Sequence, residues 1–557
     1  MTDDGALGAA LEAFFSWYYR TNPVSATFIG VHEHDSRLPD CSEHGLGDAL
    51  AGLEVLRAQF GRLPAGPRTR ADGLDRTLAE GQLDVFRWEL TSHHFHRSNP
   101  CFYTGEAIFG VVSLFLRPFA PLPIRAEAAV ERMLAVPVLL AQARGNIRSS
   151  PRAWIERARR ECSGALAFFE RGVEILIRDE RVTLPRFREA AGVAAAALRE
   201  FQAHLESELV PRATSDYACG PEALDVLMRR GHFLGMDAED VVGLAMEHMA
   251  ATTDQMTRLA TDAAADHWRD SVERLATRHA TAAGYYARYA EIWQEARAVA
   301  DAHHLVTWPD YPIRYVPQPT WAREAAPFLY FLSYRAPSAF DRVPIVDYLV
   351  TPIEPDMPEE EQQRRLRATN DSVIKLNHVV HHGGLGHHVQ NWYAYHRATS
   401  RIGRVAAVDC ASRIAMFCGG TMAEGWACYA TDVMDEIGFL DRNERIAHAQ
   451  THLRMAARAL VDVRLHQGAW TLEQAATLYQ DQAGMTPEAA RAEAVKNSMF
   501  PGAALMYLIG TDLIHRLRGD LARRKGFTLQ RFHDEFLAHG SVPVALIAAA
   551  MRGSAPP

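Results

Sequence analysis

Apolar side chains recur at three- and four-residue spacing over long stretches of the chain. The clearest examples are residues 122–146, 186–210 and 444–466, which are also rich in Ala, Leu, Arg and Glu. This spacing places the apolar side chains on one face of an α-helix, and those four residue types are strong helix formers. The pattern therefore predicts a mainly α-helical protein. No repeat period indicates a solenoid.

The pattern changes between residues 305 and 355. Ten of the 28 prolines lie between Pro309 and Pro358, in a segment that also contains YPIRYVP, PFLYFLSYRAP and IVDYLVTPI. Short aromatic and β-branched runs bounded by proline are typical of edge strands and loops. We therefore expect a helical N-terminal region over 1–304. Residues 305–557 should hold a small β-sheet (305–355) and C-terminal helices, and the whole chain should form one compact unit.

Charge and cysteine content exclude several classes of protein. Lys and Arg number 59 against 68 Asp and Glu, a net charge of −9, and no basic stripe is present, so we expect no nucleic-acid partner. The seven cysteines form no CxxC pair, which argues against a disulfide framework and a cysteine-built zinc site. The N-terminus lacks the basic region of a signal peptide, and no apolar run reaches the ~18 residues needed to cross a bilayer. These features predict a cytoplasmic protein without a membrane partner.

Histidines are concentrated in one segment. Six of the 25 histidines lie between His378 and His396, in the context LNHVVHHGGLGHHVQNW. His378 and His382 are four apart and would share a face of an unbroken helix. His381 and His387 are six apart, about 9 Å along such a helix, which is too far for one small ion. The three glycines between them can loosen or bulge the helix and bring the second imidazole back. Both pairs are candidate metal ligands, and a polar loop with surface histidines is the ordinary alternative.

A third ligand is predicted in MAEGWACYATDVM, where Glu424 follows His387 by 37 residues. Two histidines and a glutamate from a later helix are the usual protein ligands of a catalytic zincin, with water in the fourth position. On its own, EGWACY is as typical of a helix start with an aromatic core face. Because the β-prone segment 305–355 comes just before the histidine cluster, we expect the small sheet beside the metal, with Tyr330 and Tyr334 near His381.

These motifs resemble those of a known family. HHGGLGHHVQ and EGWACY are similar to the paired motifs HExxPGHHxQ and EGWAxYxE of the bacterial family called domain of unknown function 885, grouped with the zincin-like peptidases. The resemblance extends over the chain, from NPVSATFIGVHEHDSRLPD and SNPCFYTGEAIFG to RMAARALVDVRLHQGAWTLEQA, PGAALMYLIG and LQRFHDEFLAHGSVP. It implies a large helical metallopeptidase-like fold with zinc or another divalent metal. Carried over by position, the ligands are His381, His387 and Glu424. Dipeptidyl peptidase III enzymes resemble this arrangement, with one residue inserted between the histidines.

Four positions depart from the family motifs. His382 stands where the motif has the glutamate that takes a proton from the water at the metal. Leu385 replaces a proline, Thr431 the second glutamate of EGWAxYxE, and Ala503 the glutamine of PGQxxxY. These changes predict altered or lost chemistry. His382 could act as a poor base or become another ligand. Two histidines and a carboxylate also match the facial triad of non-haem iron.

Supporting groups are expected on the C-terminal helices. Arg454, Arg458, Asp462 and His466 recur every four residues and form a polar stripe, either solvated or buried beside the metal. The resemblance favours the buried stripe. Tyr507 could donate a hydrogen bond to an oxyanion. The candidate catalytic residues are His382, Tyr507 and His466, and the candidate substrate-binding residues are Arg458, Arg518 and His533.

The sequence therefore predicts a metal-dependent enzyme that acts on a small amide-bearing or amino-acid-derived substrate, including short peptides, by hydrolysis with altered chemistry. One alternative is a non-hydrolytic zinc or non-haem iron enzyme in a small-molecule pathway. Another is a pseudoenzyme that keeps the peptidase fold as a binding protein.

Overall fold

The computed structural model describes residues 3–64, 71–263, 265, 267–323, 325–326, 337–341, 343–410 and 413–553. The chain divides into two compact units, each built from several chain segments. The first contains residues 1–217, 318–343 and 408–415, and the second contains residues 218–317, 344–407 and 416–557. The boundary predicted at residue 304 lies inside the second unit.

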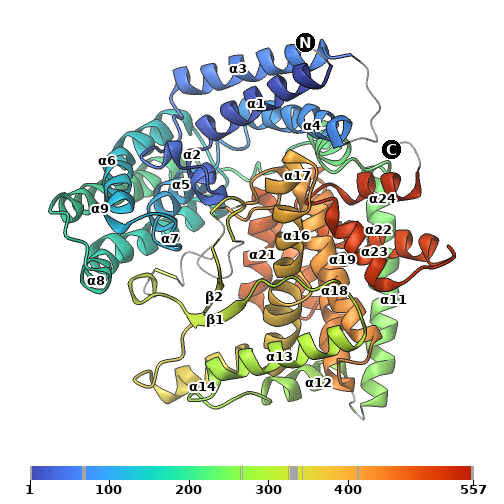
Figure 1. Cartoon of the computed structure of the whole chain (residues 1–557). Helices are drawn as coiled ribbons and strands as arrows, with labels where there is room; N and C mark the ends of the chain where they lie inside the picture. Colours follow the sequence, from blue (N-terminus) through green and yellow to red (C-terminus); the bar gives the residue numbers. More distant parts are fainter. Residues whose placement is uncertain are drawn as a thin grey trace. The chain divides into compact units, whose positions relative to one another are not determined.

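The first unit consists of helices joined by short connections (Figure 1). Its α-helices are α1 (Asp3–Thr21), α2 (Pro23–Ile29), α3 (Glu43–Gly61), α4 (Ala71–Thr91), α5 (Pro100–Val112), α6 (Leu122–Asn146), α7 (Arg152–Ala167), α8 (Val173–Glu180) and α9 (Arg186–His204). Helix α6 has the bounds that the apolar spacing predicts, although it contains Pro137. Helix α9 starts as predicted and continues into a π-helical turn at Leu205–Leu209.

The second unit carries the histidine-rich segment. Its helices are α10 (Pro221–Val226), α11 (Ala238–Asp262), α12 (Trp268–Ala276), α13 (Tyr285–Ala302), α14 (Glu359–Ala368), α15 (Asp371–Val373), the π-helix η8 (Ile374–Gly383), α16 (His387–His396), α17 (Arg401–Val405), α18 (Gly420–Glu436), α19 (Arg442–His466), α20 (Leu472–Asp481), α21 (Pro487–Met499), α22 (Met506–Leu521), α23 (Leu529–Ala538) and α24 (Val544–Arg552). Helix α19 begins with a capping box, in which Asp441 and Glu444 each bond the other's backbone N–H. This signal fixes its start two residues before the predicted range.

Two strands interrupt the helices of the second unit, as the proline-rich segment predicts. Strand β1 (Ile313–Pro317) lies in YPIRYVP and pairs in parallel with β2 (Val346–Val350) of IVDYLVTPI, with Tyr315 opposite Tyr348. Along β2, Val346, Tyr348 and Val350 are buried while Asp347 is exposed, the period of two expected for a half-buried strand. The mainly helical fold with a small sheet is thus confirmed. Tyr330 and Tyr334, which we expected near His381, lie outside the described residues.

Within the second unit, α18 and α22 approach closely at two glycines. A β-carbon on Gly425 would collide with the backbone of Gly510, and one on Gly510 would collide with the carbonyl of Thr421. Glycine at both positions therefore lets the two backbones touch, which places Glu424 of α18 close to the start of α22. None of the described helices is long and apolar enough to cross a membrane.

Candidate metal centre

The glycine-rich turn between η8 and α16 shapes the histidine cluster. The helix widens to π geometry over Ile374–Gly383, breaks, and restarts as α16 at His387. A β-carbon on Gly386 would collide with the carbonyl oxygens of Val380 and His381, so this turn requires glycine. The two histidines therefore come from different helices, and the six-residue spacing does not hold them 9 Å apart.

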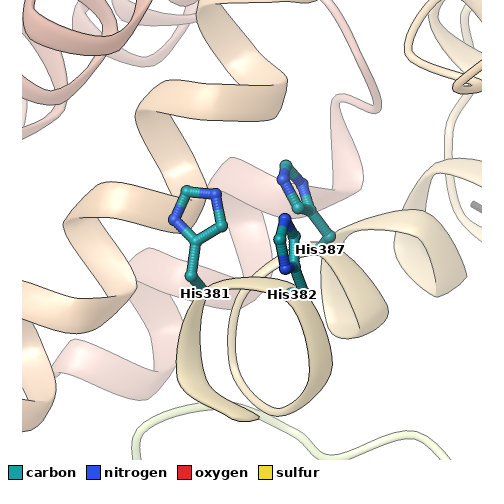
Figure 2. A group of neighbouring side chains, drawn as sticks. All are labelled: His381, His382 and His387. Atoms are coloured by element: carbon teal, nitrogen blue, oxygen red, sulfur yellow. The ribbon is translucent and has the colours of Figure 1, made fainter. Parts of the chain in front are cut away.

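The turn brings His381 and His387 to one carboxylate. The Nε2 atoms of His381 and His387 lie 3.3 Å and 3.7 Å from Oε2 of Glu424. The side chains of His381, His387 and Glu424 are 15%, 11% and 18% exposed, so the group is mostly shielded from water. One ring nitrogen from each of His381, His382 and His387 lies within 4.8 Å of the others. Figure 2 shows the three imidazoles projecting to the same side of the turn.

The indole of Trp426 connects the glutamate helix to this turn. Trp426 follows Glu424 by two residues on α18, and its Nε1 donates a hydrogen bond to the carbonyl of Leu385, 2.9 Å away. Both the indole and Leu385 are buried. This bond fixes α18 against the turn, so Glu424 and His387 keep their distance without relying on their own contact.

Polar partners orient the imidazoles. Nδ1 of His387 donates to the amide oxygen of Gln390 at 3.2 Å, and the Gln390 amide nitrogen in turn faces Ser541. The hydroxyl of Tyr348 on β2 lies 3.0 Å from Nδ1 of His382 and 2.7 Å from Nδ1 of His378. A phenol has one hydrogen and can accept further bonds through its oxygen, so at least one of these two imidazoles must donate to the hydroxyl. If His382 donates, its Nε2 keeps a lone pair for a metal ion or a proton.

His378 belongs to the support of the site. It is held by Tyr348, and its ring packs against Tyr289 at a centroid distance of 5.6 Å. It is not part of the histidine group that could hold an ion among the described residues. The geometry thus favours His381 and His387 over the rival pair of His378 and His382.

The surroundings favour neutral imidazoles at His381 and His382 and an ionised carboxylate at Glu424. Burial lowers the pKa of His381, and burial together with the neighbouring His381 and His387 holds the pKa of His382 well below its usual range. Burial raises the pKa of Glu424, but its contacts with the two imidazoles outweigh this and hold the pKa well below its usual range. Neutral imidazoles and an ionised carboxylate are the protonation states that a metal ion requires of its ligands.

A cavity of about 420 Å³ opens onto this group. Its lining includes His381, His382 and Glu424. Three further lining residues carry polar groups that could bind a substrate: Arg454, Arg458 and Tyr507. Nε of Arg458 donates to Glu493 at 2.7 Å, and its guanidinium lies 4.7 Å from the centre of the Tyr507 ring. Nε of Arg454 is buried and, within the described part of the chain, has no hydrogen-bond partner.

The polar stripe on α19 has two functions. Arg454 and Arg458 face the cavity, whereas Asp462 and His466 are fully buried. The Asp462 carboxylate accepts hydrogen bonds from the backbone N–H groups of Gly502, Ala504 and Leu505, at 2.8–3.0 Å. It thereby fixes the loop that leads into α22 and positions Tyr507. Nε2 of His466 bonds the carbonyl of Asn497, and burial lowers the pKa of this histidine to about 4.

Three predicted site residues do not line the cavity. His466 lies in the core, as described above. Arg518 binds Glu436 and the Tyr429 hydroxyl, and the buried His533 lies between the Leu305 carbonyl and Tyr429. These three residues therefore stabilise helix packing, and from their positions they would not contact a molecule in the cavity.

The structure shows the surroundings of two positions that were expected to depart from the family motifs. Thr431 lines the cavity, but its hydroxyl donates to the carbonyl of Ala427 in its own helix, so it orients no imidazole. Sγ of Cys428 lies 3.9 Å from Nδ1 of His381. Ala503 has no polar side-chain atom to offer.

The sequence analysis did not identify Tyr348 and Gln390 as residues of the site. Gln390 lies three residues after His387, the spacing of neighbours on a helix, and that signal was available. Tyr348 is 33 residues before His381 on a separate strand, and nothing in its local sequence marks it.

One comparison with known proteins gives the family, and another gives the fold. The family described as bacterial protein of unknown function (DUF885) matches residues 23–551. A candidate lipoprotein of unknown function from Shewanella oneidensis has a similar structure, with a TM-score of 0.77, 22% identity, and coverage of 98% of this chain and 99% of that chain. A candidate lipoprotein from Colwellia psychrerythraea has a TM-score of 0.77, 17% identity, and coverage of 99% and 98%. No curated protein matches the chain.

Proposed function

The chain belongs to the DUF885 family of bacterial proteins, and we propose that it is a metal-dependent enzyme with its catalytic ion held by His381, His387 and Glu424. The observation that carries the proposal is the approach of two imidazole Nε2 atoms to one buried carboxylate oxygen, at 3.3 Å and 3.7 Å. Two imidazoles and one carboxylate are the ligand types and number of a catalytic zinc site.

The chemistry of the donors fits a divalent ion. Nδ1 of His387 is engaged by Gln390, which leaves its Nε2 as the lone-pair donor on the Glu424 side. Such an outer partner is the usual companion of a metal-binding imidazole. The proposed similarity to a zincin site rests on this set of ligands and on the spacing of the motifs. A bound ion of this kind polarises a carbonyl oxygen and lowers the pKa of water.

The cavity supports a small substrate with a carboxylate. Arg454 presents a guanidinium to the cavity, and its Nε has no partner within the described residues, whereas Arg458 is neutralised by Glu493. An arginine binds a carboxylate through two parallel hydrogen bonds. We therefore assign substrate binding to Arg454 and a supporting position to Arg458. An amino-acid derivative or short peptide fits a cavity of this size, and Tyr507 is placed to donate to an oxygen of the reacting group.

His382 makes the reaction differ from ordinary zincin hydrolysis. Its imidazole belongs to the same group as His381 and His387, so it can bind the ion as well as move a proton. Binding by three imidazoles and a carboxylate would favour the second candidate function, a non-hydrolytic metal enzyme. In either case, His382 stands where a hydrolytic zincin has a carboxylate base.

Elemental analysis of the untagged protein tests the proposal. We expect an ion in the wild type that is lost from the double variant His381→Ala plus His387→Ala. His396→Ala is the matched control, because His396 is an exposed histidine on α16 whose Nδ1 bonds the carbonyl of Trp392 and whose ring stacks on the Trp392 indole. Retention of the ion at full occupancy in the double variant, or its loss on His378→Ala alone, would refute the assignment. A wild type without any metal affinity would favour a binding protein that has kept the fold.

A further inference from the structure

A second group of histidines surrounds a carboxylate on the same helix as Glu424. Asp432 lies two turns further along α18, His448 and His452 lie four residues apart on α19, and His515 lies on α22. Oδ1 of Asp432 is 2.9 Å from Nε2 of His448 and 2.6 Å from Nε2 of His452. The other oxygen, Oδ2, is 2.7 Å from Nε2 of His515.

The separation of the two imidazoles on α19 is informative. Their Nε2 atoms are 3.1 Å apart, while both face the same oxygen. Ligands at 2.0–2.1 Å from a tetrahedral zinc ion are about 3.3 Å from one another. Two Nε2–H groups at this distance would bring like partial charges together, whereas two lone pairs and a carboxylate around one cation bring opposite charges together.

We propose that Asp432, His448 and His452 form a second metal site, for a divalent first-row ion such as zinc. A histidine pair at i and i+4 with a carboxylate from another helix suits such an ion. His515 does not belong to the ligand group itself. It holds the free oxygen of Asp432 and so fixes the orientation of the carboxylate. Oδ2 of Asp435 lies 3.9 Å from Nδ1 of His448, beyond hydrogen-bond distance.

This site is separate from the first. Glu424 and Asp432 are eight residues apart on a regular helix, which corresponds to about 12 Å along the axis. The ions of a two-metal catalytic centre are ~3.5–4 Å apart. The side chains of His448 and Asp432 are nearly buried while His452 is 26% exposed, so an ion can enter from the His452 side. The ion would cross-link α18 and α19, which carry Glu424 and Arg454, and His515 of α22 would complete the contact among three helices.

The alternative is a hydrogen-bonded network without a metal ion, in which an imidazole of this group is protonated. Without an ion, Asp432 and Asp435 raise the pKa of His448 to about 9, against the effect of burial. A charged imidazole next to an ionised aspartate would also hold the helices together. The two possibilities differ in one measurable quantity, the number of metal ions that the folded chain binds.

Zinc titration of metal-stripped, untagged protein against a chromogenic chelator distinguishes them. We expect two ions per chain for the wild type and one for His448→Gln plus His452→Gln. One ion should also remain in His381→Ala plus His387→Ala, and none in the four-residue variant. His515→Gln should keep both ions but weaken one by about 10–100-fold, the usual effect of an orienting partner. His539→Gln is a control, because His539 is a histidine outside both groups that bonds the carbonyl of Glu535.

Every outcome decides the matter. An unchanged zinc count in His448→Gln plus His452→Gln would overturn this proposal while leaving the first site intact. Loss of an ion in this variant, but not in His381→Ala plus His387→Ala, would support the second site and refute the first. If a variant fails to fold, wild-type protein loaded with cobalt(II) is the second measurement. The proposal of a second site would be overturned if the visible absorption saturates at one equivalent of cobalt(II) in the wild type and is absent from His381→Ala plus His387→Ala.

Discussion

Imidazole and carboxylate groups lie together in two opposite proportions in this chain. In the cavity of the second unit, two imidazoles approach one oxygen of Glu424. In the first unit, a single imidazole, His32, lies between two carboxylates. Its Nδ1 is 2.9 Å from Asp35 and its Nε2 is 2.7 Å from Asp341. The number of imidazoles per carboxylate is therefore inverted.

This inversion separates a metal site from a proton site. An imidazole between two carboxylates can satisfy both only as a cation with two N–H donors. Several imidazoles around one carboxylate cannot all be cations at acceptable cost, and their lone pairs suit a metal ion. The Asp432 group in the second unit, with several imidazoles around one carboxylate, resembles the Glu424 group. The proportion of the two groups indicates the occupant better than the presence of histidine does.

The largest effect should follow from exchanging an imidazole for a carboxylate in the cavity. His382→Glu introduces the glutamate of the resembled HExxPGHHxQ motif, and general-base assistance is typically worth about 10²–10⁴-fold in rate. We nevertheless expect no efficient peptidase. The new carboxylate would add a negative charge beside Glu424, and the imidazole would be lost from the histidine group. Thr431 and Ala503 would still lack the carboxylate and the amide of the resembled motifs. The measurement is hydrolysis of a mixed peptide library by wild type and variant with added zinc.

His382→Gln serves as the matched control, because it removes the imidazole without adding charge. Strong new cleavage by His382→Glu, with none by His382→Gln, would mean that the chain is a peptidase that has lost only its base. Our preference for a rebuilt site would then be wrong.

The next effect concerns the cation that faces the cavity. Arg454→Gln should weaken binding of dipeptides with a free C-terminal carboxylate by about 10–150-fold, because a hydrogen bond to a charged group contributes ~1.5–3 kcal/mol. Dipeptide amides should bind equally to wild type and variant. Calorimetric titration with matched acids and amides measures this difference.

Arg464→Gln is the control for that experiment. Arg464 lies on the same helix, α19, but binds Glu239 and does not line the cavity. If both variants lose the same affinity, or if acids and amides are affected alike, Arg454 does not bind the carboxylate.

A smaller effect is expected from Tyr348→Phe, which removes the hydroxyl that His378 and His382 share. If His382 contributes to metal binding, loss of this orienting partner should weaken zinc affinity by about tenfold, at the lower end of the usual range. Tyr315→Phe is the comparison variant. Tyr315 lies opposite Tyr348 in the sheet, and its hydroxyl bonds the backbone carbonyl of His378, at 3.4 Å. Equal zinc affinity in wild type and Tyr348→Phe would show that His382 is not a ligand.

Much of this architecture follows from local sequence signals. The apolar spacing predicts α6, α9 and α19, and the proline-bounded runs predict β1 and β2, because periodicity and backbone restriction act over a few residues. The glycines between His381 and His387 predicted a broken helix, and a π-helix followed by a new helix is what forms. The convergence of the first site was predictable for the same reason.

Contacts between distant segments were not predictable in this way. Arg518 and His533 carry suitable groups, yet helix packing directs them to Glu436 and Tyr429 and away from the cavity. His448 and His452 show the same i, i+4 spacing as the rival pair in the first cluster. Their partner Asp432 is on the preceding helix, and only the packing of α18 against α19 brings it within 3 Å.

The smallest effect tests the proton side of the comparison. His32 is partly buried and stacks on Phe119, with a centroid distance of 4.1 Å. Burial lowers its pKa, but the hydrogen bonds with Asp341 and Asp35 outweigh this and raise the pKa to about 9. Because the folded-state pKa lies above the reference value of about 6.5, the stabilisation is complete below pH ~6.5 and is lost as the pH rises through about 9. Thermal unfolding midpoints of wild type and His32→Gln should therefore converge between about pH 6 and about pH 9.5, with or without a metal chelator. His44→Gln, which alters a histidine with an 85% exposed side chain, should show no such convergence. A constant or growing difference between wild type and His32→Gln, or one that a chelator abolishes, would mean that His32 is not held as a cation, and the contrast between the two arrangements would fail.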